Sequence, residues 1–110
     1  PEIDVFKYNH KNKLLMTNYW GDIAKNIFKK SSSKISADSF CNKYFIYSLE
    51  WTPEKIVWKI NNTIVKTQTK GIPDEPMYLL LSSAILTDVD DNKLPASLDI
   101  DWVRCYEMNN

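Results

Sequence analysis

The sequence contains little glycine, no excess of either charge and no long apolar run, and each shortage excludes a class of protein. The two glycines, Gly21 and Gly71, are too few for a phosphate-binding loop or a dinucleotide fingerprint. Fourteen basic residues balance fourteen acidic ones, so the charge gives no reason to expect nucleic acid or an anionic membrane as a partner. The longest apolar run, residues 77–81, is far shorter than the roughly 20 residues of a transmembrane helix. We therefore predict no membrane span.

Cysteine is also scarce. Cys41 and Cys105 are the only two in 110 residues, which is too few for a disulfide scaffold. Two separate thiols are the simpler expectation, and a single bond between them is the alternative.

Short strand patterns separated by turns make up most of the chain. A content of 44% hydrophobic and 13% aromatic residues excludes a disordered protein. Asn61 and Asn62 suit a two-residue hairpin turn, because asparagine tolerates positive φ. The polar stretch 29–34 is expected to be a loop, and residues 22–30 give only a weak helix signal. Many short strands predict an all-β sandwich, with strands expected over residues 2–6, 13–20, 43–51, 55–60, 63–67, 77–86 and 98–106.

Two carboxylates alternate with apolar residues at the start of the chain. Residues two apart share one face of a strand, so Glu2 and Asp4 should point one way, and Ile3 and Val5 should be buried between the sheets. Neighbouring carboxylates repel each other, which should raise the pKa of one of them. Taken alone, such alternation is ordinary for a solvated strand face.

Four segments together resemble glycoside hydrolase family 16. Residues 2–6 resemble its active-site strand, residues 45–58 the following hairpin, residues 72–81 the next segment, and residues 94–106 the last strand. The resemblance implies a concanavalin-like jelly roll of two antiparallel sheets, with β-linked polysaccharide lying on the concave face. It also implies retaining endo-hydrolysis, no required cofactor, and a secreted, periplasmic or cell-surface location.

The same resemblance bears on domain organisation. A jelly roll of this family runs to roughly 200–250 residues as one domain. Residues 1–110 are therefore expected to be either a single domain or the C-terminal half of a family 16 domain. In the second case we expect self-association or a missing N-terminal half.

The family pattern assigns roles to the first strand. It reads Glu-x-Asp-x-Glu, or Glu-x-Asp-x-x-Glu when a bulge adds a residue, and the three acids are nucleophile, helper and acid/base. Glu2 takes the nucleophile position and Asp4 the helper position, while the third position is Phe6 without a bulge and Lys7 with one. A lysine ammonium, with a reference pKa of about 10.4, keeps its proton when the leaving group needs one. Lys7 is therefore expected to impair hydrolysis.

Further site residues follow from the resemblance. Trp20 and Tyr19 are candidates for sugar binding, whereas Trp51 and Trp102 are expected to pack in the core. Asp101 resembles the family aspartate that ligates a structural calcium, whose other ligands would lie upstream of Pro1. The functions left open are an impaired retaining endo-β-glycanase acting on β-glucan or algal galactan, a non-catalytic polysaccharide-binding relative, and a truncated product without a function of its own.

Overall fold

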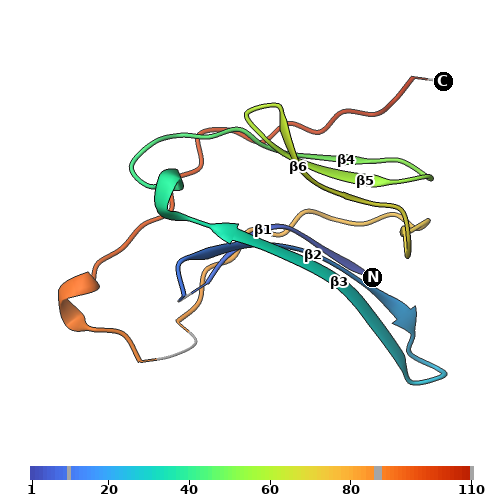
Figure 1. Ribbon diagram of the computed structural model, residues 1–110, viewed down its shortest axis with the longest axis horizontal. Helices are drawn as coiled ribbons and strands as arrows, with labels where there is room; N and C mark the ends of the chain where they lie inside the picture. Colours follow the sequence, from blue (N-terminus) through green and yellow to red (C-terminus); the bar gives the residue numbers. More distant parts are fainter. Residues whose placement is uncertain (10, 86–87, 110) are drawn as a thin grey trace. The chain divides into compact units, whose positions relative to one another are not determined.

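β-Strands provide most of the regular structure in the computed structural model, which describes residues 1–9, 11–85 and 88–109 (Figure 1). The chain divides into two units, Pro1–Leu79 and Leu80–Asn110, and the described strands all lie in the first. No helix of the described residues is long and apolar enough to cross a membrane. The elements are β1 (Glu2–Tyr8), β2 (Lys13–Asp22), β3 (Ile27–Ser36), η1 (Asp38–Phe40), β4 (Tyr47–Trp51), β5 (Ile56–Ile60), β6 (Thr63–Gln68) and η2 (Asp91–Lys93).

The strands form two antiparallel three-stranded sheets, in the orders β1-β2-β3 and β4-β5-β6. This arrangement confirms the all-β fold class expected from the sequence. The turn between β5 and β6 consists of Asn61 and Asn62, whose φ angles are 47° and 68°. Both are positive, as a two-residue hairpin that matches the twist of its strands requires. The predicted turn is therefore confirmed.

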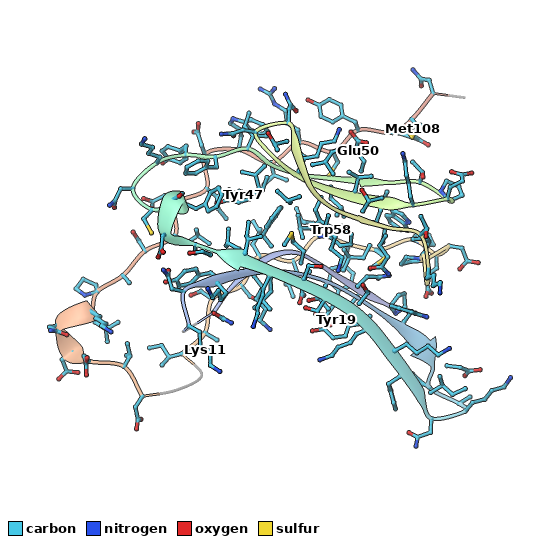
Figure 2. All side chains as sticks on the ribbon, in the orientation of Figure 1. Lys11, Tyr19, Tyr47, Glu50, Trp58 and Met108 are labelled. Atoms are coloured by element: carbon cyan, nitrogen blue, oxygen red, sulfur yellow. The ribbon has the colours of Figure 1, made fainter. Side chains whose placement is uncertain are left out.

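Two buried clusters hold the sheets together. Met16 from β2 packs with Ile56 and Trp58 from β5, and all three are 0% exposed. Leu14, Ala37 and Ile60 form the second cluster. Figure 2 shows Trp58 between the two sheets, where its indole Nε1 donates a 3.0 Å hydrogen bond to the Asp4 carbonyl of β1.

Lys66 on β6 adds a polar connection across the same interior. Its ammonium donates to the carbonyls of Met16 and Ser31 at 3.2 and 3.0 Å and to the Ser31 hydroxyl at 3.3 Å. It also lies 5.2 Å from the ring centroid of Trp58. Burial lowers the pKa of Lys66. Carbonyl oxygens and an aromatic face thus stabilise the buried cation.

The polar stretch 29–34 is a strand and not the expected loop. It belongs to β3, which pairs with β2 without interruption from Lys13↔Ser36 to Asp22↔Ile27. The weak helix signal over residues 22–30 is also wrong, because a turn follows Asp22 and β3 begins at Ile27. Strand pairing satisfies the backbone of this segment, so its polar side chains do not prevent it from joining the sheet.

Two expected strands do not form. Residues 77–85 and 98–106 have no strand structure, and Leu86, the end of the first prediction, lies outside the described residues. A strand is held by ladder hydrogen bonds to a neighbour. The ladders of the described chain join β1 to β2, β2 to β3, β4 to β5 and β5 to β6, and none includes residues 77–85 or 98–106. The apolar character of these two segments was therefore not sufficient to predict a strand.

The expected core tryptophans are also corrected. Trp51 and Trp102 are 37% and 48% exposed, whereas Trp58 is fully buried. Trp51 keeps a polar partner, since its Nε1 donates to the Pro73 carbonyl at 3.0 Å. Cys41 and Cys105 are both free and exposed.

Replacing Trp58 by phenylalanine would keep a ring in the core and remove the indole donor. We expect Trp58→Phe to lower the free energy of unfolding by about 1–3 kcal/mol, because the Asp4 carbonyl loses its partner. Urea unfolding measures this loss. Trp51→Phe is the matched control and should cost less, because water can reach its partly exposed site. Equal losses in the two variants would contradict the argument.

We also expect the isolated chain to self-associate. Within the unit Leu80–Asn110, the apolar side chains of Leu80, Leu81 and Ile85 are 71%, 58% and 70% exposed, and exposed apolar surface promotes association. Light scattering after size-exclusion chromatography should give a mass above 12.9 kDa that rises with concentration. Leu80→Glu should lower that mass. A cooperatively melting 12.9 kDa monomer at every concentration would count against the prediction.

Candidate active site on the outer face of β1

A β-bulge decides which side chains of β1 share a face. Asp4 pairs with Thr17 and Lys7 with Leu15, so three steps along β1 match two steps along β2. One extra residue in β1 shifts the alternation by one position. Glu2, Asp4 and Lys7 therefore lie on one face of β1, and Phe6 lies on the other.

The bulge also corrects the expected inward pair. Ile3 packs against the buried cluster of Met16, Ile56 and Trp58, as predicted. Its inward companion is Phe6, which contacts both buried clusters, whereas Val5 is in neither. Regular alternation had selected Val5, and the extra residue gives the inward position to Phe6.

β2 lines the same face beside the charged residues. Tyr19 lies opposite Glu2, Thr17 opposite Asp4, and Leu15 opposite Lys7. Figure 2 shows Tyr19 on the side of its sheet away from Trp58, so this is the outer face of the sandwich. Thr17 is only 2% exposed, and its hydroxyl lies 2.8 Å from the Ser32 hydroxyl of β3.

The two carboxyl groups interact directly. Burial raises the pKa of the Asp4 carboxyl above its ordinary value of 3.8, and the hydrogen bond and negative charge of Glu2 raise it further. The positive charge of Lys7 and a hydrogen bond from Tyr19 act in the opposite direction. The sequence-based expectation that one pKa of the pair rises is thus confirmed for Asp4.

This arrangement offers one exposed carboxylate for attack and a neighbour that can hold a proton. Within β1, β2 and β3, Glu2 and Asp4 are the only acids on the outer face, because Asp22 has the opposite parity along β2. The ammonium group of Lys7 lies on the same face of β1 as these two carboxyl groups.

Trp20 does not share this face with Tyr19. Side chains alternate along β2, and Trp20 packs against the backbone of Gly71 on the inner side. Gly71 has a φ of 64°, and a Cβ at that position would collide with the Trp20 ring. Trp20 instead lines a shallow hollow of about 250 Å³, together with Ser31, Thr67, Gln68, Thr69 and Lys70.

Asp101 lies in the unit Leu80–Asn110, where it is exposed. Among the described residues, no group of three or more His, Cys, Asp or Glu side chains is arranged to hold a metal ion. The calcium role of Asp101 therefore stays a prediction.

Sequence reasoning missed the third strand of the face. In register, Lys30 lies opposite Tyr19, Ser32 opposite Thr17, and Lys34 opposite Leu15. Their stretch was assigned to a loop because it is polar on both faces. A turn precedes β3: Asn26 has a φ of 54°, and its N–H donates to the Ile23 carbonyl. Asn26 was therefore the residue of the sequence that could have indicated a turn between two strands.

Comparison with known proteins gives a consistent result. The model of the family described as glycosyl hydrolases family 16 matches residues 1–104. No solved structure matches the chain. Among curated relatives, the keratan-sulfate endo-1,4-beta-galactosidase of Sphingobacterium multivorum is 28% identical over 97% of this chain and 28% of its own length. A beta-glucanase of Bacillus amyloliquefaciens is 27% identical over 94% of this chain and 44% of its own length.

A third relative matches a smaller share of both chains. The glucan endo-1,3-beta-glucosidase A1 of Niallia circulans is 27% identical over 63% of this chain and 13% of its own length. The chain thus spans less than half the length of each of these three relatives.

The raised pKa of Asp4 makes stability depend on pH. The folded chain holds the Asp4 proton more tightly than the unfolded chain, so this stabilisation is complete below 3.8 and is lost as the pH rises through the folded pKa. We expect Asp4→Asn to raise Tm at about pH 7, and this advantage should shrink toward about pH 3.

Thermal melts across this pH range measure the difference, with the exposed Asp74→Asn as control. An Asp4→Asn effect that stays constant with pH would show that charge at Asp4 is not its cause.

Proposed function

Because the chain belongs to glycosyl hydrolase family 16, whose model matches residues 1–104, we propose that it is an endo-β-glycanase-type domain with impaired hydrolysis. The outer face of β1 and β2 binds β-linked polysaccharide and cuts it slowly. One observation carries the proposal: the bulged register puts Lys7, and not a carboxylic acid, beside Glu2 and Asp4.

The chemistry explains why this substitution matters. Retaining hydrolysis uses two carboxyl groups about 5–5.5 Å apart, one to attack the anomeric carbon and one to protonate the leaving oxygen. Glu2 has the nucleophile role, and Asp4 tunes it through the carboxyl contact that raises the pKa of Asp4. The ammonium of Lys7 is too weak an acid to protonate the glycosidic oxygen as its bond breaks, and its positive charge also stabilises the Glu2 carboxylate and so weakens it as a nucleophile.

The relatives' names support a class of substrate and not a single sugar. They mention beta-glucan, 1,3-linked glucan and keratan sulfate. We propose a β-linked polysaccharide of glucose or galactose, either β-glucan or algal galactan, and a secreted, periplasmic or cell-surface location where such polymers are met. A structural calcium at Asp101 belongs to the same proposal. The alternative function is a relative that binds polysaccharide and does not cut it at all.

Restoring the acid should restore turnover. We expect Lys7→Glu to raise hydrolysis of β-glucan, agarose or carrageenan by on the order of 10²-fold or more, because a positioned acid typically contributes 10²–10⁴-fold. A reducing-end assay measures the rate. Lys7→Gln is the matched control, since it removes the charge without supplying an acid, and it should leave polysaccharide turnover low.

An aryl glycoside with a good leaving group tests whether the lack of a proton donor is what slows hydrolysis. Its departure needs little protonation, so Lys7→Glu should increase its cleavage much less than that of polysaccharide. Ordinary polysaccharide hydrolysis by the unaltered protein would overturn the proposed impairment. Another residue would then be the acid, and Asp4, whose pKa is raised, would be the first candidate.

A further inference from the structure

Lys66 points into the interior because β6 has a bulge of its own. Lys66 pairs with Trp58, whereas Ile64, two residues earlier, pairs with the residue that follows Trp58. Two steps along β6 therefore match one step along β5, and Val65 is the extra residue. In a regular strand residues 64 and 66 would share a face, but Ile64 is 59% exposed and Lys66 only 8%. The extra residue thus turns Lys66 inward.

The interior is a costly place for a lysine. Burying an ammonium group without a carboxylate partner is unfavourable, and the ion pairs of the described chain, Lys59–Glu50 and Lys93–Asp90, do not include Lys66. An apolar side chain would fill the same space without this cost. Such a side chain has no hydrogen-bond donor, however, so the bonds that Lys66 donates are what it adds to this position.

One of these bonds reaches the strand that faces the bulge of β1. Met16 is the residue of β2 opposite that bulge, between the partners of Asp4 and Lys7. Its carbonyl accepts a 3.2 Å hydrogen bond from the Lys66 ammonium. On β1 itself, the Asp4 carbonyl accepts a 3.0 Å hydrogen bond from Trp58, the strand partner of Lys66. A bulge disrupts ladder hydrogen bonds locally, so backbone carbonyls beside it need other donors. Two paired side chains of the second sheet supply one donor to each strand.

We propose that Lys66 is a positioning residue that, together with Trp58, holds the bulge of β1 and thereby keeps Lys7 on the outer face. The inference rests on the proposed function, because it concerns the geometry of the same site. Both side chains lie in the interior and act on that face only through the backbone. Without the two donors, β1 can return to regular alternation, which would move position 7 to the inner face.

The test measures whether position 7 still acts on Asp4 after Lys66 is changed. NMR titration of the Asp4 carboxyl carbon gives its pKa, which the positive charge of Lys7 lowers. Lys7→Gln should therefore raise the pKa of Asp4 in the otherwise unaltered chain. Lys66→Met keeps a long apolar stem and removes the donor. In this variant Lys7→Gln should raise the pKa of Asp4 by less than half as much, because position 7 has left the outer face.

Val57→Ala is the matched control. Val57 is 3% exposed and precedes Trp58 on β5, so it is buried in the same sheet but has the opposite parity. Its truncation loses packing without touching the bulge and should leave the Lys7→Gln shift unchanged. Lys66→Arg retains a charged donor and should keep most of the shift. Trp58→Phe removes the second donor, should reduce the shift as Lys66→Met does, and carries the test if Lys66→Met does not fold.

An undiminished shift in Lys66→Met, or an equal reduction in Val57→Ala, overturns the inference. Because these pKa measurements need no hydrolysis, that outcome leaves the proposed function standing. No shift in the otherwise unaltered chain contradicts both, since position 7 then does not act on Asp4. The gain in β-glucan hydrolysis expected from Lys7→Glu should also be smaller when Lys66→Met is added. If Lys7→Glu gives no gain while the pKa result holds, the proposed function fails and the positioning role remains.

Discussion

The hydrogen bond from the Trp58 indole to the Asp4 carbonyl joins the two sheets at the residue where β1 leaves its regular register. Trp58 is fully buried, so its donor needs a partner in the interior, and the backbone of β1 supplies it. Phe6 then enters the core one position later than simple alternation allows. Core packing thereby determines which charged side chains reach the opposite face of the same strand.

On the outer face of β1, the positive charge of Lys7 partly balances the negative charges of Glu2 and Asp4. Three carboxyl groups in the family pattern would repel one another, whereas Lys7 attracts the pair formed by Glu2 and Asp4. Its charge partly offsets the burial and repulsion that raise the pKa of Asp4. Under the proposed function, the lysine that replaces the usual proton donor therefore also relieves electrostatic repulsion, so stability and catalysis favour different residues at position 7.

The sequence determined some features well and others not at all. Hairpin chemistry identified the Asn61-Asn62 turn, and alternation placed Glu2 and Asp4 together, because both are local effects. Lys7 was expected beside Glu2 and Asp4 on a bulged strand, and the register of β1 has a shift at that point. β3 was missed because its polar residues are held by pairing with β2. Residues 77–85 have the apolar pattern of a strand, but they have no ladder partner in the described chain.

The bulge in β1 also has an evolutionary consequence. It keeps position 7 on the face of Glu2 and Asp4 whatever residue stands there, so the backbone of the site does not depend on the catalytic group. In the genetic code, a lysine codon becomes a glutamate codon through a change of its first base. The family pattern and the present residue at position 7 are thus one base change apart. Under the proposed function, a single point mutation would return an acid to this position.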